Sequence, residues 1–386
     1  MKTKSRHDNN KFEFLDEEVK VEIFRQLPVK TLVLCTCVCK SWNLLIKDSA
    51  FICDLLRNRR NDGPLALFFR HYLNYEPRVT QSDTHYVYPD FQIRRIQDFP
   101  LAHDRRHFTV TDSINGLVCV VGDNYSTKVV SRPQTLVLWN PSIRKYIILP
   151  NPNLFPKKRC FVGFGYDSRC DDYKLLRMIN LPDPADFKSV AEVFSLNSGS
   201  WKIMDSSRVP HCKISSVPGT QAIVNGIIHW NALRQDKSNV LLGFNARDET
   251  FQEIEIPQDL ASRSIDPMLL NVLVYNDSTI GIFCKERHNN YKHCRLWIMK
   301  DYGESSSWIK VFTMGEEGRH LHPVGIGVTM PIGCVGQELF YRKSEYPTGI
   351  IGINLVNGEV RYHDFLLGER FTFITTYVES LVLLNR

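Results

Sequence analysis

The sequence predicts a mostly β protein that begins with a small group of helices. Three observations support this fold class. Apolar residues recur at every fourth position near the N-terminus, which is the spacing of an amphipathic helix. Beyond residue 62 the chain consists of short runs rich in Val, Ile, Phe, Tyr and Trp between turn residues, which is typical of β-strands. A strand–turn–strand phrase then returns about every fifty residues, so the β region is built from repeats.

The composition is that of an ordinary soluble globular protein. The chain has 386 residues, of which 43% are hydrophobic and 23% are charged, and this length suggests two or three domains. No apolar run approaches the roughly twenty residues that are needed to cross a bilayer. The N-terminal run MKTKSRHDNNKFEF lacks the apolar core of a secretory signal. We therefore expect no membrane partner and a cytoplasmic or nuclear location, or both.

The net charge of +6 is concentrated near the N-terminus. Residues 1–60 contain 12 Lys/Arg and 8 Asp/Glu, a surplus of +4, whereas the remainder contains 36 and 34, a surplus of +2. A nucleic-acid-binding surface needs a large field of one sign, which the nearly neutral β region does not supply. We therefore expect no nucleic-acid partner.

The apolar positions of the first predicted helix follow a regular spacing. They are Leu15, Val19, Ile23 and Leu27. Asp16 is a candidate N-cap, since acidic residues are favoured at a helix N-terminus. Pro28 ends the helix, because proline disfavours helical geometry in the residue before it. Two further apolar-rich segments follow at 29–38 and 42–46, and Ser49 is predicted to cap one more helix.

So few short helices cannot bury their apolar faces by themselves. A unit of about forty residues usually needs a partner or a covalent staple to be stable. The helices are therefore expected to dock on another protein. From the pattern alone, a small helical cap that packs on the rest of the chain is an equal alternative.

The spacing of individual residues in this region is specific. It contains a leucine at the start of the first helix, a Leu-Pro-hydrophobic-Lys step at its end, a Val-Cys-Lys-x-Trp core and a Leu-Ile pair before a phenylalanine. These residues are Leu15, Leu27, Pro28, Val29, Lys30, Val38, Cys39, Lys40, Trp42, Leu45, Ile46 and Phe51. The pattern resembles the F-box of plant F-box proteins. One position departs from it, because Asp16 stands where the family has proline.

The resemblance implies that residues 10–60 are a three-helix F-box that binds a Skp-type adaptor and, through it, a cullin. The implied adaptor-binding residues are Leu15, Asp16, Leu27, Pro28, Leu32, Val38, Trp42, Leu45 and Ile46. Four of them are expected to present apolar area to the adaptor, and they are Leu15, Leu27, Pro28 and Leu32. Trp42 is expected to hold the third helix by packing. Because the family's proline contacts the adaptor and cullin, Asp16 is expected to weaken adaptor binding.

The repeated phrase of the β region has a measurable period. Its equivalent positions are Asn140, Asn197, Asn245, Ile298 and Asn354, which are separated by 57, 48, 53 and 56 residues. A period near fifty with about four strands per unit is typical of a kelch-like β-propeller blade. Five repeats are visible, and residues 65–96 are long enough for a sixth.

We therefore predict a kelch-like β-propeller of about six blades in residues 63–386. The final segment, 372–384, is expected to pair with strands near 65–69, which would close the ring and remove both sheet edges. A β-sandwich of stacked sheets is the alternative architecture.

Several phrases of the β region also resemble a known domain. They are LWNPSIRKYIILP, GFGYDSRCDDYKLLRM, EVFSLNSGSWK and TYVESLVLLNR, and they resemble the F-box-associated interaction domain of plant F-box/kelch-type proteins. Together with the F-box, this resemblance covers nearly the whole chain. It implies the substrate-recognition subunit of an SCF-type ubiquitin ligase. The propeller would bind an unidentified target protein and lead to its ubiquitination and proteasomal degradation, through residues that the sequence does not assign.

Two other receptor functions are compatible with these phrases. They also resemble the S-locus F-box proteins, which select secreted ribonucleases in self-incompatibility. A basic ribonuclease should be attracted to an acidic surface, and the nearly neutral β region argues weakly against this function. A scaffold that no longer engages a ligase is the second alternative, because Asp16 departs from the F-box pattern.

The sequence lacks recognisable motifs of catalysis. The GFGYD run at 163–167 has no third glycine and precedes a strand-like run, so it does not fit a dinucleotide loop. No H-E-x-x-H, G-x-S-x-G or Walker sequence occurs. The eleven cysteines include no C-x-x-C pair, and Cys35, Cys37 and Cys39 are expected to be small buried thiols that do not share a metal. We predict a non-catalytic protein without cofactor or metal; a kelch-like oxidase is the enzyme alternative.

Overall fold

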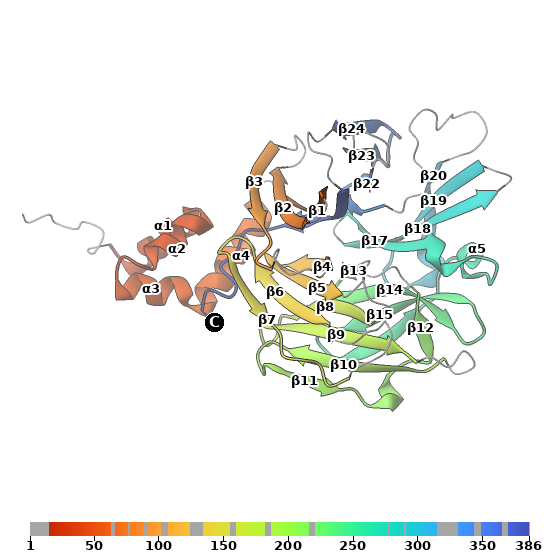
Figure 1. Ribbon diagram of the computed structural model, residues 1–386, viewed down its shortest axis with the longest axis horizontal. Coiled ribbons are helices and arrows are strands. Elements are labelled where there is room, and N and C mark those ends of the chain that lie inside the picture. Colours follow the sequence, from red (N-terminus) through yellow and green to blue (C-terminus); the bar gives the residue numbers. More distant parts are fainter. Residues whose placement is uncertain are drawn as a thin grey trace, which may run out of the picture.

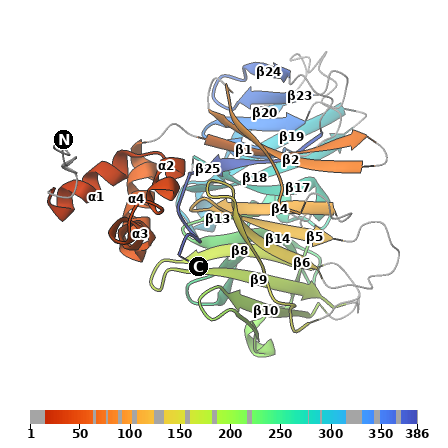
Figure 2. The same cartoon turned by 60° about the vertical axis from the view of Figure 1, so that its left-hand side comes forward.

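A group of helices lies against one face of a ring of β-sheets (Figures 1 and 2). The computed structural model describes residues 15–62, 66–75, 78–87, 92–101, 107–123, 134–154, 160–181, 187–215, 221–276, 278–288, 291–314, 331–342, 349–364 and 370–385. The start of the predicted F-box, 10–14, and residues 63–65 lie outside these ranges.

Four helices form the N-terminal unit. They are α1 (Glu17–Gln26), α2 (Val29–Cys35), α3 (Lys40–Lys47) and α4 (Ser49–Asp62). Helix α1 ends before Pro28, as predicted. The predicted cap is confirmed in position for Asp16 and is wrong for Ser49. Asp16 lies at the N-cap position of α1 without a capping side-chain hydrogen bond. Asp48, not Ser49, caps α4, since its carboxylate accepts hydrogen bonds from the backbone N–H groups of Ala50 and Phe51 at 2.9 and 3.1 Å.

In the described part of the remaining chain there are six sheets, five of them with four strands and one with five. The first consists of β25 (Arg370–Tyr377), β1 (Ala66–Tyr75), β2 (Arg78–Val87) and β3 (Gln92–Asp98). The second consists of β4 (His107–Ile114), β5 (Leu117–Asp123), β6 (Thr135–Asn140) and β7 (Lys145–Ile148). The third consists of β8 (Phe161–Asp167), β9 (Asp172–Asn180), β10 (Ser189–Ser195) and β11 (Ser200–Ile203).

The remaining three sheets continue around the ring. The fourth consists of β12 (Cys212–Ile214), β13 (Ala222–Val224), β14 (Ile227–Arg234), β15 (Asn239–Asn245) and β16 (Thr250–Ile254). The fifth consists of β17 (Leu270–Tyr275), β18 (Thr279–His288), β19 (Tyr291–Met299) and β20 (Trp308–Met314). The sixth consists of β21 (Gly333–Val335), β22 (Glu338–Arg342), β23 (Gly349–Asn354) and β24 (Val360–Asp364).

The innermost strands contact one another in order and close the ring. Strand β4 contacts β25 and β8, the fourth sheet contacts β8 and β17, and β21 contacts β17 and β25. The six sheets are therefore the blades of a β-propeller. This confirms the predicted fold class, and the sandwich alternative is wrong.

The last strand closes the propeller by joining the first blade. Strand β25 pairs antiparallel with β1, from Ala66 opposite Tyr377 to Tyr72 opposite Arg370. The predicted pairing is thus confirmed up to Tyr377. Its extension to Leu384 is wrong, because residues 378–385 leave the sheet and lie next to the helices.

The repeated asparagine is explained by the turn after the third strand of a blade. Its side-chain oxygen accepts a hydrogen bond from the backbone N–H two residues later, at 2.9 Å in each case, in the pairs Asn140–Ser142, Asn245–Arg247 and Asn354–Val356. In the third blade this role belongs to Ser195, whose hydroxyl accepts from the Ser198 N–H, and the predicted Asn197 lies two residues further on. Ile298, in the fifth blade, lies within β19.

The core of the propeller lies between neighbouring blades. Between the third and fourth blades, Met178, Trp230 and Phe244 belong to one buried cluster. Gly163 is needed there, because a Cβ atom at this position would lie 2.4 Å from the Trp230 ring. The absence of a side chain on β8 therefore allows the largest aromatic group of the next blade to pack directly against the strand.

The propeller has two different faces. Short turns join the first strand to the second and the third to the fourth, for example Asn115–Gly116 and residues 141–144 in the second blade. We call this side the turn face. Because strands alternate in direction, the other connections lie on the opposite side, the loop face. Several of them are longer, as in residues 255–269, which contain α5 (Gln258–Ala261) and a 3-10 turn at Pro267–Leu269.

Candidate partner-binding surface of the helical unit

The four helices share one compact core. Its buried members include Phe24 of α1, Leu32 of α2, Ile46 of α3 and Leu55 of α4. Trp42 packs edge-on against Phe24, with 5.1 Å between ring centroids. The packing role predicted for Trp42 is therefore present in the structure.

The residues predicted to bind an adaptor fall into three groups. Leu32 and Ile46 are fully buried, so they offer no surface to a partner, and the expectation that Leu32 presents apolar area is wrong. Three residues are half-buried against the same core, and they are Leu27, Trp42 and Leu45. The others lie at the surface: Leu15 is half-buried, and Asp16, Pro28 and Val38 are exposed.

Sequence reasoning missed four exposed apolar residues as binding candidates. They are Val19 and Ile23 on α1, Leu34 on α2 and Leu44 on α3. Leu34 and Leu44 are 64% and 75% exposed, and the predicted Val38 is 62% exposed. Large apolar side chains that stay in water beside a buried core are candidates for contact with a partner.

Helix α1 has apolar residues on two faces. Val21 and Phe24 belong to the core, whereas Val19 and Ile23 face solvent. The middle of the every-fourth-residue stripe, Val19 and Ile23, is thus exposed, whereas its last member, Leu27, packs against the core. On its polar side Lys20 pairs with Glu17 and Arg25 pairs with Glu22, both at 2.9 Å.

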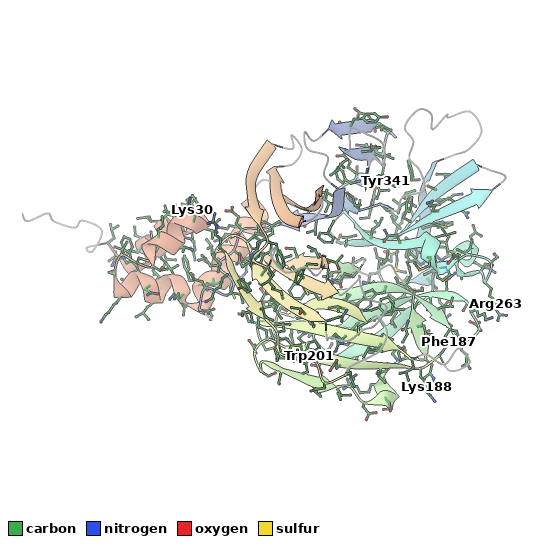
Figure 3. All side chains as sticks on the ribbon, viewed as in Figure 1. Lys30, Phe187, Lys188, Trp201, Arg263 and Tyr341 are labelled. Carbon is green, nitrogen blue, oxygen red and sulfur yellow. The ribbon has the colours of Figure 1, made fainter. Side chains whose placement is uncertain are left out.

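The helical unit and the loop face of the propeller differ in how their charged side chains are arranged. Lys30, Lys40 and Lys47 are exposed on the helical unit, consistent with its positive surplus. On the loop face opposite charges are paired. Arg234 donates to Glu253 and Glu255 at 2.8 and 2.6 Å, and Arg263 lies 3.7 Å from Asp236. Figure 3 shows Lys30 and Arg263 at opposite ends of the molecule.

The part of the chain that the structure describes contains no group of three His, Cys, Asp or Glu side chains able to hold a metal. The expectation for the clustered cysteines is wrong in part: Cys37 and Cys39 are exposed, and Cys35 is half-buried. Among the described helices, none has the length and apolarity required to cross a membrane.

Comparison with protein families matches both parts of the chain. Residues 17–53 match an F-box-like family, and residues 75–330 match the F-box associated β-propeller domain. The chain belongs to the F-box associated β-propeller family. Both matched ranges lie inside the domains expected at 10–60 and 63–386, and the exact bounds of those domains stay predictions.

Plant F-box proteins are similar to this chain over much of its length. A putative F-box protein of Arabidopsis thaliana is 29% identical over 244 residues, which is 63% of this chain and 61% of that protein. An F-box/kelch-repeat protein of the same plant is 23% identical over 351 residues, 89% of each chain. The solved structure of TolB from Acinetobacter baumannii has a TM-score of 0.50 at 9% identity, covers 85% of this chain and 72% of TolB, and shows the fold alone.

Proposed function

We propose that this F-box protein is the substrate-recognition subunit of an SCF-type ubiquitin ligase. Its helices bind a Skp-type adaptor, and the adaptor links them to a cullin. The propeller binds a target protein, which is then ubiquitinated and degraded by the proteasome. The subunit itself is non-catalytic and acts in the cytoplasm or the nucleus.

The observation that carries the proposal is a set of apolar side chains that stay exposed on the helical unit although its core, which includes Leu381 from the end of the chain, is filled. Val19, Ile23 and Leu44 are not needed to complete that core, so a partner gains their burial. Burying apolar area contributes about 25 cal/mol per Å², and a few central side chains usually dominate such an interface. The surplus of +4 in residues 1–60 favours an adaptor surface that is acidic.

The propeller supports the target-binding half of the proposal by its two-faced construction. The helical unit lies against the turn face, where Ile143 of the turn at residues 141–144 packs against the helical core (Figure 2). The loop face points away from it and carries long connections such as residues 255–269. Loops on a rigid scaffold can vary in shape without loss of the fold, which suits the recognition of a target. Adaptor and target would therefore bind at opposite ends of the protein.

Leu44→Asp is expected to weaken adaptor binding by about 100-fold while the protein stays folded. A charge in the buried centre of an apolar interface costs roughly 3 kcal/mol, but Leu44 is 75% exposed, so the exchange costs the free protein little. Val356→Asp, on the exposed turn of the sixth blade, is the matched control. The measurement is titration with a purified Skp-type adaptor, followed by capture of cullin. Equal affinity of the two variants would place the adaptor on another surface, and no binding by the natural protein would favour a ligase-independent scaffold.

Asp16→Pro is expected to strengthen adaptor binding by about fivefold. The backbone of Asp16 has φ −60° and ψ 149°, which proline adopts without strain. The exchange also replaces an exposed carboxylate by apolar area worth about 1 kcal/mol on burial. Asp16→Ala separates the two effects, because it removes the charge without adding the ring. If all three proteins bind equally, the departure from the family pattern has no consequence for binding.

A further inference from the structure

The end of the chain lies between the helices and the propeller. After β25, residues 378–385 leave the ring at the turn face and run beside the second blade toward the helices (Figures 1 and 2). We call this segment the C-terminal strap. It is separated from the helices by more than three hundred positions in the sequence, yet the structure brings the two together.

Neighbouring side chains of the strap are buried in different cores. Leu381 is 1% exposed and belongs to the helical core with Phe24 and Phe51. Leu383 is also 1% exposed, but it belongs to the core between the second and third blades. Val382 packs against both clusters. The strap therefore completes the F-box core with one residue and is anchored in the propeller by another.

Polar contacts hold both ends of the strap. Asn140, which is fully buried, donates through its amide nitrogen to the Ser380 and Val382 carbonyl oxygens at 3.1 and 2.8 Å. The amide of Asn385 donates to the Ser49 hydroxyl at the start of α4, at 3.2 Å. A buried amide that loses such partners costs about 1–3 kcal/mol, so the strap is fixed on the propeller side.

The backbone of the strap has an unfavourable conformation at Leu383. Leu383 has φ +74°, a left-handed conformation that costs a branched residue about 1–2 kcal/mol. The burial of its side chain offsets that cost. A flexible tail would relax to ordinary backbone angles, so the strained conformation indicates a segment whose position is determined by its contacts.

The strap passes directly over the β4–β5 turn. A Cβ atom on Gly116 would lie 2.3 Å from the Val378 carbonyl oxygen and 2.6 Å from the Ser380 hydroxyl. The turn at Asn225–Gly226 in the fourth blade has the same residue pair and nearly the same backbone, with φ +72° for Gly226 against +74° for Gly116. No heavy atom lies within 4 Å of the Cβ position on Gly226.

We infer that the F-box of this protein is not an independent module, because the C-terminal strap completes its core and couples it rigidly to the propeller. The strap thereby controls adaptor binding and fixes the position of the adaptor relative to the target-binding face. Leu381 acts as a positioning residue, since it lies in the core beneath the proposed adaptor surface. The part of this inference that concerns the adaptor rests on the proposed function.

The test compares Gly116→Ala with Gly226→Ala. Both changes add the strain of a left-handed alanine, but only Gly116→Ala displaces the strap. Amide hydrogen exchange in residues 24–55 is expected to become about 10-fold faster in Gly116→Ala than in Gly226→Ala. Exchange in β14 and β18 should be equal in the two variants. Adaptor affinity should fall by about 10-fold in Gly116→Ala only.

Leu381→Asp keeps the test decisive if Gly116→Ala also disturbs the second blade. It should accelerate exchange in the helices without affecting the sheets, and Leu381→Met should restore protection and adaptor affinity. Unchanged helical exchange in both Gly116→Ala and Leu381→Asp would overturn the inference. If the natural protein binds no adaptor, the proposed function fails, and the exchange data alone decide whether the strap couples the two parts.

Discussion

Replacing Glu192 with alanine is expected to lower the free energy of unfolding by about 3–5 kcal/mol. Glu192 on β10 lies opposite Arg177 on β9, and the two side chains form an ion pair in which they are 0% and 2% exposed. Burial raises the pKa of Glu192, although Arg177 acts in the opposite direction. Removing the carboxylate would leave the guanidinium buried without a counter-charge, and a buried uncompensated charge is strongly unfavourable.

The same ion pair also positions the connection between the second and third blades. The Glu192 carboxylate accepts hydrogen bonds from the backbone N–H groups of Asn153 and Leu154 at 2.9 and 3.3 Å. The Arg177 guanidinium donates to the Leu154 carbonyl oxygen at 3.2 Å and lies 5.7 Å from the centre of the Trp201 ring. Glu192→Ala is therefore expected to loosen residues 150–154 as well.

Urea denaturation measures the loss of unfolding free energy in Glu192→Ala, and two further variants serve as controls. Glu359→Ala removes a half-exposed carboxylate that lies 3.3 Å from Arg361, and such a surface pair contributes little to stability. The double variant Arg177→Met/Glu192→Leu should be far less destabilised than Glu192→Ala, because it buries no charge. Equal losses in Glu192→Ala and Glu359→Ala would show that the buried pair is not important for stability.

The sequence predicted where the helices lie in the chain, but not which face of α1 is buried. The spacing of apolar residues and Pro28 locate α1 because both act through the local backbone. Which apolar face is buried depends on contacts with α3 and α4. Phe24 meets Trp42 in the core, whereas Ile23, its neighbour, stays outside. No property of α1 alone distinguishes the two residues, so the exposed binding surface emerged only from the structure.

The propeller shows the same division between local and long-range information. Its period is encoded in turns that each blade forms by itself, such as the one at Asn245, and these are visible in the sequence. Asn140 has the same turn, and its amide also reaches Ser380, 240 positions away. Contacts of this kind have no period, which is why the strap and the buried Glu192–Arg177 pair could not be predicted. The last residues were expected in a strand because ESLVLLNR resembles the NGLVCVV strand of another repeat.

Two buried acid–base groups on the propeller give its stability a dependence on pH. His229 on β14 is buried, and its Nδ1 lies 3.1 Å from the Ala222 carbonyl oxygen. A carbonyl can only accept, so Nδ1 carries the proton and Nε2 accepts a hydrogen bond from the Tyr302 hydroxyl at 2.7 Å. The hydroxyl in turn accepts from Gln252 at 2.7 Å. This chain joins the fourth and fifth blades with a neutral imidazole.

Lowering the pH from 7.5 to 5.0 is expected to cost the natural protein about 2 kcal/mol through His229. Burial lowers the pKa of His229 to about 4, from about 6.5 in the unfolded chain. The unfolded state then binds the proton first, so stability is complete above pH 6.5 and is lost as the pH falls toward 4. Burial has the opposite effect on the pKa of Asp112, which it raises to about 6. Asp112 therefore contributes stability at low pH that is lost as the pH rises through 6.

The two groups can be separated by substitution, because each variant removes one titration. Urea denaturation at pH 7.5 and 5.0 should show a smaller loss at low pH in His229→Gln than in the natural protein. Asp112→Asn should show a larger loss, since it removes the group that becomes stabilising as the pH falls. Identical pH dependence in His229→Gln and the natural protein would mean that the imidazole can be protonated within the folded state. The His229–Tyr302 contact between the blades would then tolerate a positive charge.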